Sequence, residues 1–324
     1  SYYNAIINWV KQRYDLIVTK EVINFVPGIV PGIGMAMNCF TQKGDKVMIQ
    51  PPVYHPFAWV TTRNERTLVT NPLKWENGMY RMDLDAFREL IKGCKLFILC
   101  NPHNPGGVVW TEAELRAIAD ICYDEKVLVF SDEIHADLTL PPHTHRPFAT
   151  VSEKARMNSV TFMSPSKAFN MPGLSASHAL IFNEDLRKRF RIYMDAGELD
   201  MGHVFAFLSV EAAYSHGTEW LDQCLAYIQG NIDFVDEFLK KHAPKIKAIR
   251  PEASYLVWLD CRELELSQKD LNEFFVDKAH LALNDGEMFG KEGIGFMRLN
   301  VASPRCIIEK AMKQLADAYQ LYIK

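Results

Sequence analysis

Seven short apolar runs alternate with stretches of helical spacing over the first 182 residues of this 324-residue chain. Each run is four to six residues long and rich in Val, Ile, Leu or Phe, as expected for buried strands. Strands that alternate with helices predict a mainly parallel sheet covered by helices on both faces. The runs occupy residues 22–26, 46–50, 66–70, 95–100, 127–130, 159–163 and 178–182. The expected helices cover residues 2–14 and 32–40 and begin again near Asp83 and Thr111.

The pattern changes after about residue 203. Helical spacing continues over residues 204–214 and 219–241, and the second stretch is long enough to bridge two domains. Beyond it, strands expected at 255–259 and 295–299 alternate with helices expected at 269–280 and 305–322. A chain of this length usually needs more than one hydrophobic core. We therefore expect a large α/β domain over residues 1–216, and an interdomain helix with a small α+β domain over residues 217–324.

The composition is that of a soluble globular protein, with 48% hydrophobic and 23% charged residues. The net charge of −4 gives no reason to expect nucleic acid or an anionic membrane as a partner. No apolar run reaches the length of a membrane span. The seven cysteines are scattered without CxxC or zinc spacing, which indicates reduced thiols and a cytoplasmic protein.

Polar segments follow four of the predicted strands. Lys167 lies in SPSKAFN, directly after the run at 159–163, and α/β folds place their chemistry beyond the carboxyl ends of strands. The other three segments are PPVY after residue 50, NPHNPGG after residue 100 and SDEIH after residue 130. Together they supply the groups that pyridoxal phosphate requires.

Four parts of that cofactor have a candidate partner among these segments. Lys167 can form a Schiff base with the aldehyde. The carboxylate of Asp132 can keep the pyridine nitrogen protonated, so that the ring accepts electrons. Asn104, with His135 close by, can donate a hydrogen bond to the phenolic oxygen. Tyr54 offers a flat partner for the face of the ring.

The phosphate is the fifth part, and it needs backbone amides at a helix N-terminus together with hydroxyl groups. Suitable residues precede the helix expected at 32–40 or flank Lys167. They are Gly28, Ile29, Val30, Ser164 and Ser166.

Each of these residues alone has an ordinary structural explanation. A lysine such as Lys167 is most often a surface charge, Asp132 could cap a strand, and Tyr54 could be part of a core. Asn104 and Pro105 could simply form a turn. The combination in this order along one α/β pattern favours the cofactor site.

The same residues resemble a fold-type I pyridoxal phosphate enzyme of the class I/II aminotransferase superfamily. Within it, the chain is most similar to the MalY/PatB branch of cystathionine β-lyases, or C–S lyases. The similarity extends over essentially all of the chain. It is carried by NPHNPG at residues 101–106, SDEIHADL at 131–138, SPSKAFN at 164–170 and GFMRLN at 295–300.

The resemblance implies the fold of the aspartate aminotransferase-like transferases. That fold has a mixed, mostly parallel seven-stranded sheet with helices on both faces, and a small α+β C-terminal domain. It also implies a homodimer with the active site at the domain and subunit boundary. Arg298 is then the arginine that grips the substrate α-carboxylate in a bidentate pair, assisted by Asn104. Lys167, Asp132 and Tyr54 form the catalytic group.

Two departures from ordinary aminotransferases resemble the C–S lyases. His135 stands where aminotransferases usually have Tyr, and Ser175 stands where they usually have an Arg that binds the phosphate. The expected reaction is therefore α,β-elimination of cystathionine or an S-substituted L-cysteine to pyruvate, ammonia and a thiol, with Lys167 as the base at Cα. Transamination of an L-amino acid is the alternative. The resemblance further implies an N-terminal segment before Ser1 that gives a Tyr to the partner's phosphate site.

Three other readings have less support. A dinucleotide site at GIGMAM, residues 32–37, lacks the third glycine and the acidic residue that such sites use. A metal site at His135, His143 and His145 lacks helical or strand pairing, so no metal is expected. A regulatory protein that only binds the cofactor would have no need of the carboxylate clamp at Arg298.

Overall fold

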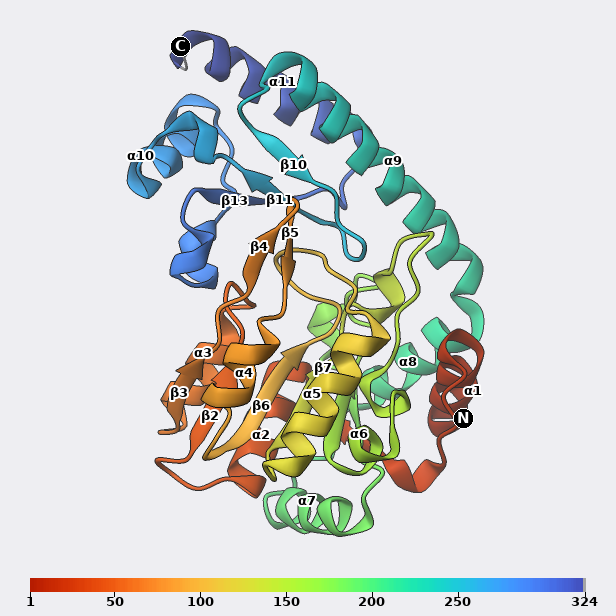
Figure 1. The fold of residues 1–324 in the computed structure, drawn as a ribbon. Helices are drawn as coiled ribbons and strands as arrows, with labels where there is room; N and C mark the ends of the chain where they lie inside the picture. The colour runs from red at the N-terminus through yellow and green to blue at the C-terminus, as the bar shows by residue number, and fades with distance from the viewer. Residues whose placement is uncertain (323–324) are drawn as a thin grey trace.

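The computed structural model describes residues 1–322 of the chain. Figure 1 shows a larger body built on a seven-stranded sheet and a smaller one built on a four-stranded sheet, with the long helix α9 (Thr218–His242) running along both. No helix within residues 1–322 is long and apolar enough to cross a membrane.

The large sheet has the strand order β1-β9-β8-β7-β6-β2-β3. Strand β9 runs antiparallel to both of its neighbours, and the other strand pairs are parallel. The expected mixed, mostly parallel seven-stranded sheet is thereby confirmed. The strands are β1 (Ile23–Val26), β2 (Lys46–Ile49), β3 (Thr67–Thr70), β6 (Cys94–Cys100), β7 (Leu128–Asp132), β8 (Ser159–Met163) and β9 (Ser177–Leu180).

Both faces of this sheet are covered because alternate residues of the central strands point to opposite sides. Leu96 and Ile98 of β6 belong to one buried cluster, and Phe97 and Leu99 belong to another. The first face is covered by α2 (Ile29–Phe40), α3 (Pro56–Arg63) and α7 (Glu184–Ala196). The second face is covered by α4 (Leu84–Leu90), α5 (Glu112–Asp124) and α6 (Glu153–Met157).

The first helix packs against the segment that leads to α9. Trp9 of α1 (Tyr2–Tyr14) stacks on Tyr214 of α8 (Val204–His216), with ring centroids 4.7 Å apart. Farther along α9, Val235 and Leu239 are buried with residues of the small sheet. One continuous core therefore extends from the first helix to the small sheet.

The small sheet is antiparallel, in the order β10-β11-β13-β12, and packs against α9 and α11 (Arg305–Tyr322). Its strands are β10 (Lys247–Ile249), β11 (Leu256–Asp260), β12 (Asn284–Asp285) and β13 (Phe296–Asn300). The helix expected over 269–280 is wrong in its second half, because α10 (Gln268–Glu273) gives way to a π-helical turn at Phe274–Lys278. The hairpin of β4 (Lys74–Glu76) and β5 (Met79–Arg81) was not predicted.

Two element boundaries differ from expectation at positions that matter for function. The helix expected to begin at residue 32 begins at Ile29, after Gly28 with φ 118°, a left-handed conformation that favours glycine. The strand expected at 127–130 continues to Asp132. Gly28 and Ile29 therefore lie at the start of α2, and Asp132 lies at the end of β7.

Candidate active site

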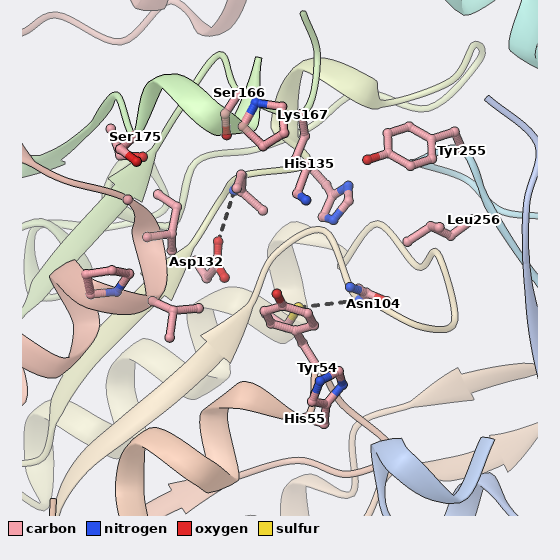
Figure 2. Close-up of a pocket in the computed structure, with 18 of the residues that line it drawn as sticks. Tyr54, His55, Asn104, Asp132, His135, Ser166, Lys167, Ser175, Tyr255 and Leu256 are labelled. Carbon is pink, nitrogen blue, oxygen red and sulfur yellow. Dashed lines mark hydrogen bonds between the residues drawn. The ribbon is translucent and has the colours of Figure 1, made fainter. Parts of the chain in front are cut away.

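A cavity of about 540 Å³ lies at the carboxyl ends of four adjacent strands of the large sheet, β2, β6, β7 and β8 (Figure 2). Residues of the small sheet close it from the opposite side. The predicted site residues that line it are Gly28, Ile29, Val30, Tyr54, Asn104, Asp132, His135, Ser166, Lys167 and Arg298.

The sheet order explains how residues far apart in sequence meet here. Tyr54 follows β2, Asn104 follows β6, Asp132 ends β7 and Lys167 follows β8, and these four strands are hydrogen-bonded neighbours that run parallel. The carboxyl ends of parallel neighbours share one edge of a sheet, which is where α/β proteins bind their ligands.

Asp132 is a buried carboxyl group, with 3% of its surface exposed. Its Oδ1 accepts a hydrogen bond of 3.1 Å from the backbone N–H of Ile134. Burial raises the pKa of Asp132 to about 7, although that hydrogen bond and the nearby Lys167 act in the opposite direction. A carboxyl group with this proton affinity can share a proton with a ring nitrogen placed beside it.

Lys167 and His135 both line the cavity, and Figure 2 shows the lysine amine beside the imidazole ring. His135 is buried, and its Nδ1 has no hydrogen-bond partner within residues 1–322. Burial, together with the nearby charges of Lys167 and Arg298, lowers the pKa of His135 to about 3. The imidazole is therefore neutral at physiological pH, and one ring nitrogen is free to bond a ligand.

The N-terminus of α2 forms one end of the cavity. The amides of Gly28, Ile29 and Val30 precede Pro31, which has no N–H. Ser175, which stands where aminotransferases usually have an arginine, lines the same cavity with Ser166. Hydroxyl groups and helix N-terminal amides together form a suitable anion site without an arginine.

Ser164 is the one predicted site residue that does not line the cavity. Its Oγ lies 2.7 Å from the carbonyl oxygen of Ala176 and 2.9 Å from Oγ of Ser166. It also accepts a hydrogen bond of 3.1 Å from the N–H of Ser166. Ser164 therefore braces the loop that carries Ser166 and Lys167.

Arg298 enters the cavity from β13 of the small sheet. Its Nη1 donates to Oδ1 of Asn104 and its Nη2 donates to Oδ1 of Asn284, both over 2.8 Å. The guanidinium carbon lies 4.6 Å from the ring centroid of Phe289, and Nε is buried without a partner among the described residues. Burial lowers the pKa of Arg298 to about 10, so the group stays cationic at neutral pH.

Sequence reasoning missed several residues of the cavity, including His55, Asn284, Tyr255 and Asn300. Tyr255 immediately precedes β11, and its ring centroid lies 6.2 Å from that of His135. Figure 2 shows its hydroxyl group directed into the cavity. In the sequence, Tyr255 was marked only by its position at the start of the strand predicted at 255–259.

The site fits pyridoxal phosphate better than the alternatives. His135 and the buried carboxyl group of Asp132 both line the cavity that Lys167 enters. By contrast, Gly32 lies inside α2 and not in a phosphate-binding loop, which contradicts the dinucleotide reading. The three histidines of the rejected metal reading also have different surroundings, because His145 pairs with Glu133 while His135 lines the cavity.

Comparison with known proteins adds independent observations. The sequence matches the family described as aminotransferase class I and II over residues 1–315. Cystathionine beta-lyase PatB of Bacillus subtilis (strain 168) is 38% identical over 317 residues, which are 97% of this chain and 82% of that protein.

Two solved structures are similar over nearly the whole chain. Cystalysin from Treponema denticola, which contains a pyridoxal 5'-phosphate cofactor, gives a TM-score of 0.96 at 34% identity, covering 98% of this chain and 82% of that one. The pyridoxal-phosphate-bound C-S lyase from Staphylococcus hominis gives 0.92 at 32% identity, covering 100% of this chain and 84% of that one.

Proposed function

The chain belongs to the class I and II aminotransferase family, and we propose that it is a pyridoxal-phosphate-dependent carbon–sulfur β-lyase. Its substrate is cystathionine or another S-substituted L-cysteine, and its products are pyruvate, ammonia and a thiol. The observation that carries the proposal is the meeting of Lys167, Asp132 and Arg298 in one cavity of a chain that resembles lyases of this kind.

The bound cofactor supplies an electron sink for the electrons of the substrate's Cα–H bond. Asp132 holds the proton at the ring nitrogen, and its buried carboxyl group is suited to that work. Asn104 and His135 would hold the phenolic oxygen of the cofactor, and Tyr54 would provide a flat partner for its ring. The amides at the start of α2, with Ser166, would hold its phosphate.

Arg298 and Lys167 act on the substrate. Arg298 binds the α-carboxylate with its planar fork, which places the amino acid between the two sheets. The amine of Lys167 takes the proton from Cα and holds it while the Cβ–S bond breaks. Because His135 is neutral, it does not act as a second cation that competes with Arg298 for the substrate α-carboxylate.

The products formed from cystathionine in the absence of any keto acid test this function. A lyase releases pyruvate, ammonia and thiol over many turnovers, because it needs no second substrate to regenerate. A reaction that stops after one turnover per site and resumes only when a keto acid is added would identify an aminotransferase instead. His135 and Ser175, where aminotransferases usually have Tyr and Arg, favour the lyase. The Lys167→Ala variant provides the background rate.

The proposed assembly is a homodimer in the cytoplasm. Four large apolar side chains at the start of α8 are more than half exposed in one protomer: Met201, Val204, Phe205 and Leu208. A second copy of the chain that covers this patch would remove it from water. The seven cysteines are free thiols, which suits a reducing compartment. Replacing Phe205 and Leu208 with Ser should shift the molar mass in light scattering towards the monomer, whereas a wild-type monomer would contradict the dimer.

We also propose that residues 1–216 and 217–324 form the two domains, with the site between them. The contribution of Arg298 and Tyr255 from the small sheet supports this division. Limited proteolysis that releases a fragment ending near residue 217 would test it.

A further inference from the structure

The end of β7 carries two neighbouring carboxyl groups that point to opposite faces of the sheet. Asp132 faces the cavity. Glu133 points to the other side, together with Ser131, because side chains alternate along a strand. The side chain of Glu133 is fully buried, with 0% of its surface exposed. A buried acid directly behind the proposed ring-nitrogen partner therefore needs an explanation.

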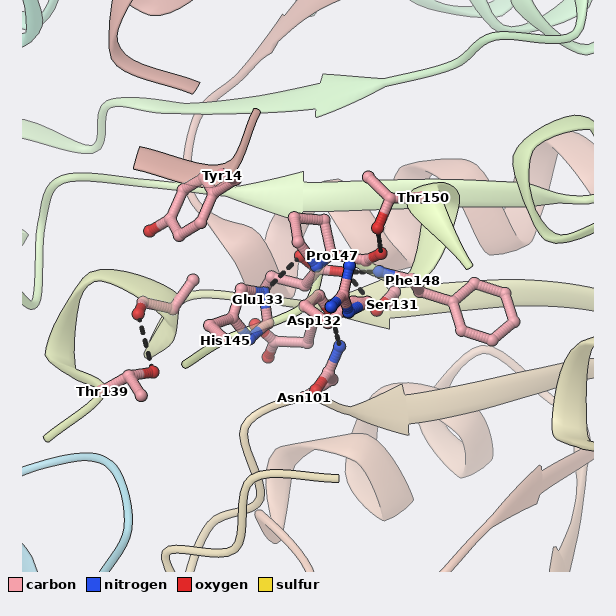
Figure 3. Close-up of polar contacts among 12 residues, drawn as sticks. Tyr14, Asn101, Ser131, Asp132, Glu133, Thr139, His145, Pro147, Phe148 and Thr150 are labelled. Carbon is pink, nitrogen blue, oxygen red and sulfur yellow. Dashed lines mark hydrogen bonds and ion pairs between the residues drawn. The ribbon is translucent and has the colours of Figure 1, made fainter. Parts of the chain in front are cut away.

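Three donors satisfy Glu133, as Figure 3 shows. Oε1 accepts hydrogen bonds of 2.8 Å from Oγ of Ser131 and from the backbone N–H of Phe148. Oε2 lies 2.8 Å from Nε2 of His145, whose side chain is 1% exposed. Both oxygens of this buried carboxyl group therefore have hydrogen-bond donors.

The surroundings of His145 indicate its protonation state. Its Nδ1 is buried and has no hydrogen-bond partner in the part of the chain that the structure describes. An imidazolium would place an N–H there and leave a buried donor unsatisfied, which is unfavourable. The neutral tautomer, with its proton on Nε2, donates to Glu133 and leaves no such donor. In this tautomer every N–H of the imidazole has a partner.

The loop that contains His145 is bonded to the ends of both β6 and β7. Next to His145, the carbonyl oxygen of Arg146 accepts a hydrogen bond of 3.2 Å from Nδ2 of Asn101. The backbone N–H of Asn101 in turn donates to the carbonyl oxygen of Asp132 over 2.9 Å. The backbone of Asp132 is thus fixed from its own strand, from β6 and from this loop.

We propose that Glu133 and His145 are positioning residues for Asp132, which hold the end of β7 in place and keep a second negative charge behind the Asp132 carboxyl group. This inference rests on the proposed function, in which Asp132 meets the cofactor's ring nitrogen. The added charge strengthens the hold on the ring proton, because a proton between Asp132 and the ring is attracted by both acids.

Other ionisable groups lie near Asp132 and Glu133, and their charges also act on a proton held by Asp132. Towards the cavity they are Tyr54, Cys100, His135 and Lys167. Behind Glu133, the ring of Tyr14 packs edge-on against His145, and Tyr14 bonds to Asp137 beside Arg13. None of these groups donates a described hydrogen bond to Glu133 in residues 1–322, so the charge stays with the pair.

The experiment uses the holoenzyme loaded with pyridoxal phosphate that carries ¹⁵N in its ring. The nitrogen chemical shift reports whether the ring nitrogen is protonated, independently of turnover. In Glu133→Gln, which keeps the size and removes the charge, the midpoint for loss of the ring proton should fall by at least about one pH unit. Glu133→Asp, which keeps the charge, should restore most of the wild-type midpoint.

The matched control is Asn231→Ala, which breaks buried hydrogen bonds to the carbonyl oxygens of Val301 and Ser303 far from Asp132. It should lower the melting temperature and leave the midpoint unchanged. A Glu133→Gln midpoint equal to that of wild type overturns the inference. A wild-type enzyme whose ring nitrogen is not protonated overturns the proposed function as well, so the two failures are distinguishable.

His145→Gln tests separately whether a charge on His145 cancels that of Glu133. The glutamine amide donates to Oε2 as a neutral histidine does, so the midpoint should not change. A rise of about one pH unit would show that His145 had been a cation that cancelled the charge of Glu133, and it would overturn the proposal.

Discussion

Arg298 donates a hydrogen bond from Nη1 to Oδ1 of Asn104 over 2.8 Å, which joins β13 of the small sheet to the loop after β6 of the large one. The amide oxygen of Asn104 is thereby occupied, and its Nδ2 is the group left to donate to the cofactor's phenolic oxygen. A substrate carboxylate that binds Arg298 must therefore form its pair next to this bond or replace it. The residues proposed to hold cofactor and substrate are physically coupled.

Arg298→Ala should weaken the binding of every amino-acid substrate, because the α-carboxylate is common to all of them. Loss of a charge-assisted bidentate pair should cost on the order of 2–5 kcal/mol of binding free energy. Arg298→Lys is the matched control, since it keeps the charge and loses the fork, and it should recover only part of the affinity. Titration with two unrelated amino acids measures the effect, and unchanged affinity for both would contradict the clamp.

Reduction of the holoenzyme with borohydride should fix the cofactor on Lys167. The lysine follows β8 and enters the cavity beside Asp132 and His135, which places its amine where the aldehyde has to be held. Peptide mapping by mass spectrometry identifies the labelled residue. A label on any other lysine would refute the assignment, and Lys167→Ala should take up no label.

The parts of the site that could be predicted from the sequence lie at strand ends. Asn104, Asp132 and Lys167 each follow or end an apolar run, so local pattern and the shared edge of parallel strands were enough to bring them together. Asn284 and Phe289 could not be found in this way. They reach Arg298 only because β12 pairs with β13 and the following turn packs under the guanidinium group.

The errors have equally specific causes. Ser164 was grouped with Ser166 because both are hydroxyl residues next to Lys167, but only the fold shows that the Ser164 hydroxyl is directed at the carbonyl oxygen of Ala176. The pairing of His145 with the buried Glu133 was not predicted, because it is a tertiary contact that local spacing does not indicate. The π-helical turn at Phe274–Lys278 follows a regular apolar spacing, which does not distinguish it from α-helix.

Asp132→Asn should keep the cofactor and lose most of its turnover. The amide has nearly the same shape, so Lys167 and the phosphate contacts still hold the cofactor, but an amide cannot keep the ring nitrogen protonated. Absorption spectra measure cofactor content, and pyruvate release measures the rate. A rate near that of wild type in a fully loaded variant would show that another carboxylate serves the ring nitrogen.

The cofactor-free protein should become less stable as the pH rises through the range in which Asp132 ionises. Burial, with a smaller contribution from the charge of Glu133, raises the pKa of this carboxyl group from 3.8 to about 7. A group whose pKa is higher in the folded state contributes most to stability below its unfolded pKa, and that contribution is lost as the pH rises through its folded pKa. Between pH 5 and pH 8 the loss should be roughly 2 to 3 kcal/mol of the free energy of unfolding.

Asp132→Asn isolates this contribution, because the amide is neutral at every pH while all other titrating groups are retained. Urea unfolding of the two cofactor-free proteins at pH 5 and at pH 8 gives the comparison. The variant should gain stability relative to wild type by that same amount when the pH is raised. Parallel pH dependence of the two proteins would mean that Asp132 ionises near its ordinary pKa and that its burial is relieved in solution.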